Sequence, residues 1–453
     1  MPPPPPHPER LHALDNLRAT MMWLGIVLHV AVIHLAGPSP LPWRDNQTTP
    51  AADLLVAFIH AFRMPVFFIL AGFFVALLIA RRGARAMVRS RLQRLALPFA
   101  LFWPPLFALC GVLALAFMHR MARGTWGLDP ALMQTAPSTP AGPSTMHMWF
   151  LWMLLWLSLG TALAHAALAR LAPAAPRWLG RAMARLGRTP WGLALLTLPL
   201  AGAGMLYPDG LLRPNGAFLP PWTEWLHNGL FYGFGLALYA HREALLAHYV
   251  RRWPWYAGAG LVLFCATGAL FEARPHAAEG LPEALRLGVA LAYNATAWCW
   301  SLALIGGFLA HVPRRSAWLG YLADSSYWVY LVHMPMTIGF GALLFGLEWP
   351  AGAKIGLNIA ATSLLSLASY HLLVRYSAVG TLLNGQCHTR APRPLPSAAT
   401  VTAWPMAMRH MHDAAPQRPC RSGRQEAPTA PFSGAASAYQ SSARRLFDAL
   451  REL

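Results

Sequence analysis

The chain has 453 residues, of which 56% are hydrophobic and only 12% are charged, and its formal net charge is +19. Soluble globular domains carry about 25% charged residues, so this composition excludes a soluble enzyme and indicates an integral membrane protein. The positive charge by itself would suit a nucleic-acid partner, but the arginines gather in the short loops between apolar segments, which is typical of membrane topology, and we expect no nucleic acid.

Apolar segments of about 20 residues, the length that a helix needs to cross a bilayer, recur along the chain. The predicted fold class is therefore all-α, a polytopic membrane helix bundle with about ten transmembrane helices. The opening stretch MPPPPPHPER has no basic region of the kind that begins a secretory signal, so we expect no cleavable signal peptide. The ten predicted spans are about 17–36, 53–80, 96–118, 147–169, 190–207, 225–241, 253–272, 286–310, 321–346 and 353–375.

Arginines are concentrated in alternate loops, which indicates orientation, because the inner loops of membrane proteins are enriched in Lys and Arg. This asymmetry predicts that both termini are cytoplasmic. Lys354 is the only lysine, and we attribute its rarity to coding bias. The spacing of the five cysteines indicates neither a structural disulfide nor a metal site. The predicted organisation is a disordered Pro-rich N-terminus (1–12), a membrane domain (13–376) and a basic, Pro/Ala-rich, disordered cytoplasmic tail (377–453).

The first span carries Arg18 and His29 eleven positions apart. Eleven steps along a helix complete three turns plus about 20°, so both side chains share one face, roughly 16 Å apart along the axis. Ionisable residues inside a membrane are costly and usually functional, so we interpret His29 as catalytic. Arg18 serves either in catalysis or as a topology anchor, and Asp15, on the same face, either in catalysis or as a helix N-cap.

The second span carries His60 and Arg63 one helical turn apart, followed by Pro65. Counted from the opposite membrane face, Arg63 lies about level with His29, near the middle of the bilayer. An arginine at that depth needs an anionic partner or a polar cavity. No carboxylate is predicted at the same level, so the sequence favours a cavity for a charged substrate or transition state.

Three further clusters follow in the chain. Arg91 and Arg94 lie in a strongly basic loop after the second span, where guanidinium groups serve either topology or phosphate binding. His147 and Trp149 stand at the outer end of the fourth span, where aromatic residues also form the interfacial belt. Tyr327 and His333 belong to the ninth span, with His333 near mid-depth. We interpret these last four residues, with His60, as candidates on the substrate side: His60, His147, Trp149, Tyr327 and His333.

These segments together resemble the acyltransferase 3 family of integral membrane acyltransferases over about 13–376. The resemblance is carried by LDNLRA with its arginine and histidine eleven positions apart, by RLQR, by HMWFL and by SSYWVYLVHMP. FIHAFRMPVFF and YLVHMPMT are most similar to the branch that modifies glucans. The resemblance implies that His29 and Arg18 are essential and that Arg91 and Arg94 bind acyl-CoA. It also implies the bacterial inner membrane, an acyl-CoA donor with no tightly bound cofactor, and a glycan acceptor.

The predicted function is therefore transfer of a succinyl or acetyl group from cytoplasmic acyl-CoA to a periplasmic or cell-surface glycan, with osmoregulated periplasmic glucans as the acceptor that the branch implies. His29 acts either as general base or as acyl carrier. Arg63 either stabilises the oxyanion or binds a carboxylated acyl chain. The alternative is a transporter or exporter of a glycan or lipid-linked intermediate, because charges near the midplane suit that class too.

Overall fold

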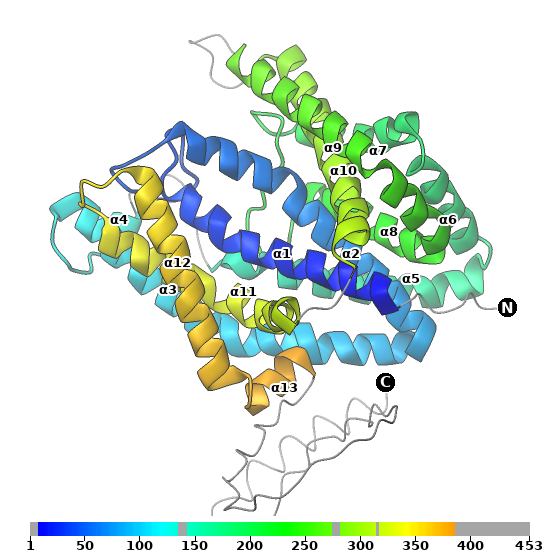
Figure 1. The fold of residues 1–453 in the computed structure, drawn as a ribbon, viewed down its shortest axis with the longest axis horizontal. Helices are drawn as coiled ribbons and strands as arrows, with labels where there is room; N and C mark the ends of the chain where they lie inside the picture. Colours follow the sequence, from blue (N-terminus) through cyan, green and yellow to red (C-terminus); the bar gives the residue numbers. More distant parts are fainter. Residues whose placement is uncertain (1–7, 135–142, 274–280, 314–316, 386–453) are drawn as a thin grey trace, which may run out of the picture. The chain divides into compact units, whose positions relative to one another are not determined.

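The computed structural model describes residues 8–134, 143–273, 281–313 and 317–385, and in these stretches the regular structure is entirely helical apart from one isolated bridge between Leu35 and Thr49. The predicted all-α fold class is confirmed (Figure 1). The principal helices are α1 (Pro8–Val32), α2 (Pro50–Arg91), the π-helical η1 (Leu92–Ala96), α3 (Leu97–Arg123), α5 (Trp149–Leu171), α6 (Ala175–Leu186), α7 (Pro190–Gly204), α8 (Trp222–Ala240), α9 (Arg242–Glu272), α10 (Glu283–His311), α11 (Ala317–Leu344) and α12 (Ala351–Ser369).

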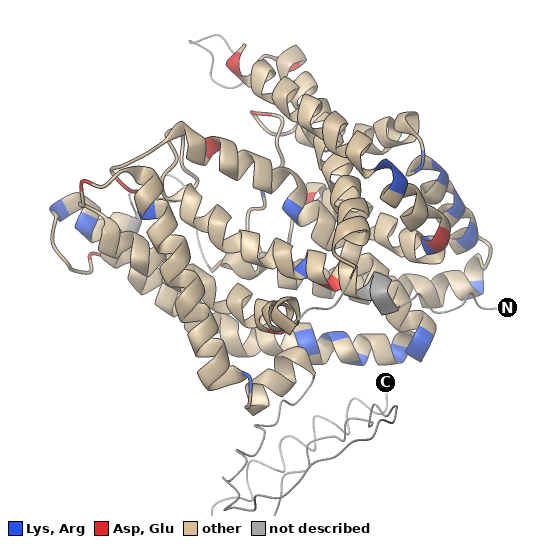
Figure 2. Ribbon diagram, in the orientation of Figure 1, with Lys and Arg blue, Asp and Glu red and all other residues tan. Residues whose placement is uncertain are grey.

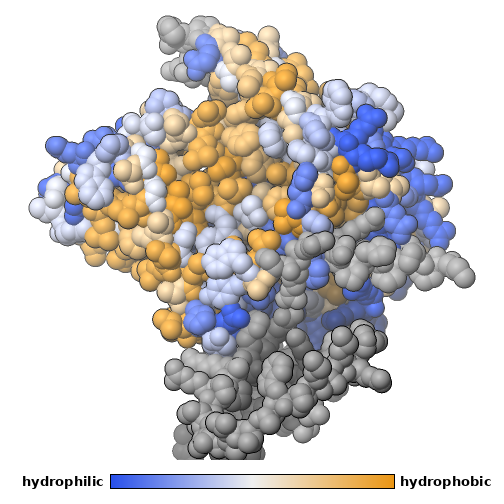
Figure 3. Space-filling view, in the orientation of Figure 1, coloured by the Kyte–Doolittle hydropathy of each residue, from blue (hydrophilic) through white to orange (hydrophobic). Residues whose placement is uncertain are grey.

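Six helical stretches among the described residues are long and apolar enough to cross a membrane, and they identify a multi-pass membrane protein. The number is lower than the ten spans predicted, for local reasons. Two predicted spans fall in the single stretch Pro50–Arg123, although the non-helical Gly83 (φ +80°) breaks α2 between them. Helix α7 has only 15 residues, and α1 and α8 are not among the six. Figure 3 shows apolar residues over the middle of the visible face and hydrophilic residues gathered towards α6. The exact number of crossings stays a prediction.

Helix α1 packs between α2 and α11, and these three helices carry most of the predicted site (Figure 1). Helix α2 also packs closely against α8 because two glycines face the partner backbone. A Cβ added at Gly72 would lie 2.1 Å from the Tyr232 carbonyl oxygen, and one added at Gly235 would lie 2.0 Å from that of Ile69. Small residues that let helix backbones approach are a common means of association in membranes. The contact fixes α2, and with it Arg63, against the bundle.

Lys354 forms a buried ion pair that the sequence did not predict. Its Nζ lies 2.7 Å from Asp45 Oδ1 and 3.2 Å from the Asn46 side-chain oxygen, and the Lys354 and Asp45 side chains are 0% and 1% exposed. Asp45 belongs to the loop between α1 and α2, whereas Lys354 lies in the first turn of α12. The pair therefore ties that loop to α12, a structural role of Lys354 that the rarity of lysine did not indicate.

We expect Lys354→Met to lower the melting temperature of the protein in detergent, because it leaves Asp45 as a buried charge without its cation. Breaking a buried pair in this way costs about 3–5 kcal/mol. The double variant Asp45→Asn/Lys354→Met should recover part of the loss, since an asparagine oxygen can still accept the Gln47 backbone N–H that Asp45 accepts at 2.8 Å. A melting temperature of Lys354→Met equal to that of the unmodified protein would contradict a stabilising role for the pair.

Both predicted disordered ends overlap the described part of the chain. Helix α1 starts at Pro8, so the last residues of the predicted disordered segment 1–12 are helical. Helix α13 (Ala378–Asn384) likewise lies within the predicted tail 377–453 and packs against α11 and η1. Residues 1–7 and 386–453 fall outside the described residues, so the prediction for them stays a prediction.

Candidate active site

Three histidines from separate parts of the chain meet in the bundle. His29 comes from α1, His147 from the short 3₁₀ turn Met146–Met148 that precedes α5, and His333 from α11. The ring centroids of His29 and His333 are 5.2 Å apart, and those of His147 and His333 are 5.4 Å apart. The ring of Tyr330 lies 5.8 Å from that of His147. The structure thus brings three sequence-predicted histidines into one cluster.

Hydrogen bonds set the tautomers of two of these histidines. His333 Nδ1 lies 2.8 Å from the Tyr330 carbonyl oxygen, and His147 Nε2 lies 3.1 Å from the Leu331 carbonyl oxygen. A carbonyl oxygen only accepts, so each of these nitrogens carries the proton of the neutral ring. The other nitrogens, His333 Nε2 and His147 Nδ1, are buried and have no hydrogen-bond partner among the described residues. The cluster therefore holds two unused lone pairs that can accept a proton or a hydroxyl hydrogen bond.

The backbone around His147 is built to hold that ring in place. Met146 has φ +49°, the only positive φ of a non-glycine residue in the described stretches. Such a conformation costs on the order of 1–3 kcal/mol and is often found at functional sites. The strain is held from both sides, because Thr145 bonds Gly216 through its backbone N–H and its hydroxyl, and the Tyr330 hydroxyl donates to the His147 carbonyl oxygen at 2.8 Å.

Arg63 supplies a fixed cation beside the histidines. It is 7% exposed, and its Nε donates to the Met21 carbonyl oxygen of α1 at 3.0 Å. Gly25 makes the approach possible, since a Cβ there would lie 2.6 Å from Arg63 Nη2. The Arg63 charge acts electrostatically on both His29 and His333, and no carboxylate in the described part of the chain forms an ion pair with it. The arrangement leaves the guanidinium charge available to a ligand.

His60 and Trp149 lie in an adjoining pocket rather than in the histidine cluster itself. Both line it together with residues that the sequence analysis did not select, chiefly His227 and Asn228 of α8 and Tyr293 of α10. Asn228 Nδ2 is buried without a partner among the described residues. The signal for the missed pair was present in the sequence, because His227 and Asn228 stand next to each other beyond the polar first turn of the helix and before the apolar run GLFYGFGLAL.

A second group of predicted residues gathers at the α2–η1 junction. Figure 2 shows arginines following one another along the end of α2 and into η1. The charges of Arg18, Arg91 and Arg94 are close enough to repel one another, and Arg91 Nε is buried without a partner in the described residues. Arg91 immediately precedes the π-helical segment that contains Arg94. Segments of π-helix are rare and frequently mark functional sites.

Two of the remaining predictions need correction. Asp15 is not the N-cap of α1, because that helix begins at Pro8; its carboxylate instead lies 3.4 Å from Arg18 Nη2. Tyr327 is not beside the other substrate-side candidates, because its hydroxyl donates to the Arg94 carbonyl oxygen at 2.6 Å. Tyr327 therefore belongs to the arginine group and supports the irregular backbone of η1.

The chain is similar to known proteins. Residues 11–372 match the model of the acyltransferase 3 family, which is described as an acyltransferase domain. The chain is similar to the glucans biosynthesis protein C of Shigella dysenteriae serotype 1 (strain Sd197) and to that of Escherichia coli O157:H7 (strain EC4115 / EHEC). Both are 32% identical over 149 residues, which cover 32% of this chain and 37% of each relative. The matched part thus spans little more than a third of these relatives. No solved structure matches the chain.

Proposed function

The chain belongs to the acyltransferase 3 family, and from this premise we propose that it transfers an acyl group, succinyl or acetyl, from cytoplasmic acyl-CoA to a hydroxyl of a periplasmic or cell-surface glycan. That it is an acyltransferase and a multi-pass membrane protein follows from the family and the apolar helices. The donor, the acceptor and the bacterial inner membrane are parts of the proposal.

The observation that carries the proposal is a buried histidine cluster with two free lone pairs beside an arginine that has no carboxylate partner among the described residues. Acyl transfer from a thioester to an alcohol needs a base for the hydroxyl proton and a cation for the oxyanion. His29 is suited to the first role and Arg63 to the second. His333 and His147, held in single tautomers, orient the hydroxyl and His29.

Two routes through His29 fit this arrangement. As general base, His29 accepts the proton of the sugar hydroxyl while the hydroxyl oxygen attacks the thioester carbonyl carbon. The CoA thiolate then leaves and is protonated. As acyl carrier, a His29 nitrogen first takes the acyl group from CoA and the sugar oxygen then takes it from the imidazole. Rapid-quench mass spectrometry of one turnover separates the routes, because only the second adds the mass of the acyl group to the peptide containing His29.

The arginine group supports the placement of the donor. Arg91, Arg94 and Arg18 present guanidinium groups, which bind phosphate oxygens through paired N–H donors. Along α1, Arg18 and His29 are separated by roughly 16 Å, so a donor whose phosphates are held by the arginines must extend its acyl arm into the bundle to reach His29. An elongated thioester such as acyl-CoA has that form, whereas a compact acyl donor does not.

We expect Arg91→Ala and Arg94→Ala to raise the KM for acyl-CoA at least about tenfold while changing the KM for the glycan little, since a charge-assisted contact to phosphate contributes about 1.5–3 kcal/mol to donor binding. Steady-state kinetics with each substrate varied in turn measure both constants. Arg89→Ala is the matched control, because it removes an arginine of the same helix. An unchanged KM for acyl-CoA in both variants would indicate that Arg91 and Arg94 serve membrane topology and do not bind the donor.

The pocket beside Arg63 supports the placement of the acceptor. Trp149 offers an aromatic face, and His60, His227, Asn228 and Tyr293 offer hydrogen-bonding groups. Glycans present hydroxyls together with apolar C–H faces, so this mixture of groups suits them. The cavity of about 30 Å³ has room for a hydroxyl or hydroxymethyl group of the glycan rather than for a whole ring. The name of the similar relatives, glucans biosynthesis protein C, favours a glucan, and we include osmoregulated periplasmic glucans in the proposal on that ground.

The decisive experiment measures release of free CoA by the full chain reconstituted in liposomes, with acetyl- or succinyl-CoA on the side of the arginine group and a glucan on the other. Release that depends on both substrates, with mass spectrometry showing the acylated glucan, is the expected result. The alternative, a transporter or exporter, predicts movement of the glycan across the bilayer without CoA release. That outcome would overturn the proposed reaction.

A further inference from the structure

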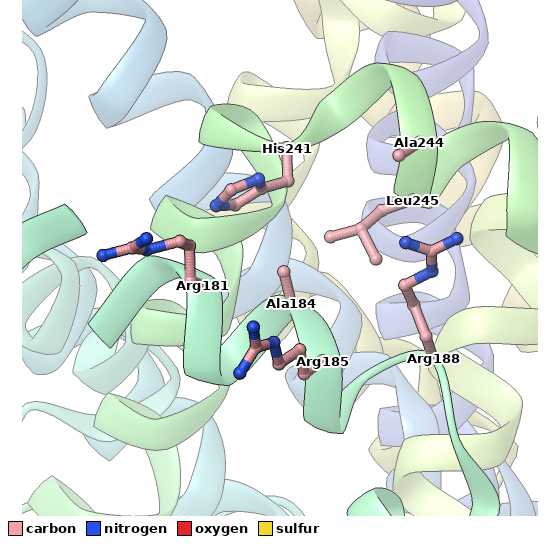
Figure 4. A pocket seen from close by; sticks show the side chains of 7 residues that line it. All are labelled: Arg181, Ala184, Arg185, Arg188, His241, Ala244 and Leu245. Atoms are coloured by element: carbon pink, nitrogen blue, oxygen red, sulfur yellow. The ribbon is translucent and has the colours of Figure 1, made fainter. Parts of the chain in front are cut away.

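A cationic cleft lies away from both groups described above, between α6 and the start of α9. Arg181, Arg185 and Arg188 line it together with His241, the residue that links α8 to α9. Figure 4 shows Arg188 on one side of the opening and the other three basic side chains on the opposite side, with Ala184 and Leu245 between them. The cavity measures about 180 Å³, several times the roughly 30 Å³ that one water molecule occupies.

Arg181 and Arg185 lie one turn apart on the same face of α6, and Arg188 follows in the turn after that helix, across the opening from them. None of them forms an ion pair with a carboxylate in the part of the chain that the structure describes, and no acidic residue lines the cleft. Membrane topology accounts for arginines in an inner loop, but it does not require three of them to line one cavity. Guanidinium groups that line one cavity without a counter-ion favour an anion with several oxygens.

The cleft is held in shape by contacts beneath it. The Tyr249 hydroxyl donates to the Gly187 carbonyl oxygen at 3.0 Å, and this tyrosine is 0% exposed. Thr189 caps α7 by accepting the Gly192 backbone N–H. The turn that carries Arg188 is therefore fixed against α9 and α7, and the arginine side chains extend from a rigid base.

The surroundings of the cleft point to a lipid rather than to a soluble ion. Helix α6 has only 12 residues, too few to span a bilayer, and carries arginines together with large exposed apolar side chains. Trp178 is 65% exposed and Leu179 is 50% exposed, while Trp191 at the start of α7 is 61% exposed. Short helices that combine basic residues with exposed Trp and Leu lie at the membrane interface, where anionic headgroups are found.

We propose that this cleft binds the phosphate of an anionic phospholipid headgroup. Arg181, Arg185 and Arg188 donate to the phosphate oxygens, and Trp178, Leu179 and Trp191 contact the adjoining acyl chains. The inference does not depend on the reaction proposed above, because none of these residues belongs to the histidine cluster, the acceptor pocket or the arginine group at η1.

The test is native mass spectrometry of the purified, delipidated full chain titrated with phosphatidylglycerol. We expect Arg181→Gln/Arg185→Gln to weaken binding about tenfold, which corresponds to 1.4 kcal/mol. The matched control is Arg170→Gln/Arg177→Gln, which removes the same charge from exposed positions outside the cleft and should change binding less than about twofold. Equal weakening in both double variants would overturn the proposal, since only net charge would then matter.

Further arms identify the source of the phosphate. Phosphatidylcholine, whose choline cancels the phosphate charge, should bind more weakly than phosphatidylglycerol. Inorganic phosphate should displace phosphatidylglycerol from the unmodified protein only at high concentration. Tight phosphate binding that leaves lipid binding unchanged would overturn the lipid assignment, and so would a raised acyl-CoA KM in Arg181→Gln/Arg185→Gln. The melting temperature of each variant shows whether it is folded. A folded Arg188→Gln protein whose lipid binding is unchanged would also contradict the proposal.

Discussion

Replacing His29 by alanine should abolish acyl transfer while the protein still inserts into the membrane and accumulates normally. The ring centroid of His29 lies 5.2 Å from that of His333, and His29 lies within the electrostatic influence of Arg63. Within the cluster, His29 is the histidine that α1 supplies. Loss of a positioned base lowers the rate by about 10²–10⁴, and loss of an acyl carrier lowers it at least as much. The measurement is CoA release in liposomes at matched protein amounts.

The control for this prediction is His165→Ala. His165 is an exposed histidine near the end of α5. Its replacement removes an imidazole that is not part of the histidine cluster. We expect wild-type transfer from that variant. A well-expressed His29→Ala protein with normal transfer would remove His29 from the mechanism and shift attention to the free lone pair of His333.

The sequence was sufficient to predict the central part of the candidate site because helix geometry is regular. The spacing of Arg18 and His29 placed both on one face, and counting the rise from opposite ends placed His29, Arg63 and His333 at similar depth. In the structure the ring centroids of His29 and His333 are 5.2 Å apart, and Arg63 is close enough to act electrostatically on both. No knowledge of helix packing was needed for that step, since each residue was located along its own helix.

What the sequence did not reveal depended on contacts between distant segments. The pairing of Lys354 with Asp45 requires the loop after α1 to fold back onto α12, and no periodicity encodes that. The π-helical turn at Leu92–Ala96 has the composition of an ordinary basic helix, because inserting one residue into a turn leaves no compositional signal. The same is true of the left-handed conformation of Met146, which is not a glycine or an asparagine.

The error over Tyr327 had a different origin. Tyr327 and His333 lie six residues apart on one helix, which separates them by about 9 Å along the axis and roughly 120° around it. They therefore cannot serve the same small site, and the structure places them with different groups: Tyr327 with Arg94, and His333 with His29. Grouping them by motif alone ignored a separation that the helix geometry already required.

Arg63→Lys should be a poor replacement, with transfer at least about 100-fold slower, although it keeps the positive charge, because removing one donor from an oxyanion site costs about 10²–10³ in kcat. Arg63 uses Nε to bond the Met21 carbonyl oxygen and still has its two terminal nitrogens. A lysine ammonium is a single point of charge, so it cannot keep that bond and hold a carboxylate or oxyanion bidentately as well.

The same variant also separates the two roles open to Arg63, because acetyl- and succinyl-CoA differ in one carboxylate. If Arg63 stabilises the oxyanion, kcat should fall equally for both donors, since both pass through the same tetrahedral intermediate. If Arg63 binds the carboxylate of a succinyl chain, succinyl transfer should fall much more than acetyl transfer, chiefly through the donor KM. Wild-type rates with both donors would leave Arg63 as a structural residue that joins α2 to α1 through the Met21 carbonyl oxygen. The space that Gly25 leaves beside its guanidinium would then serve packing alone.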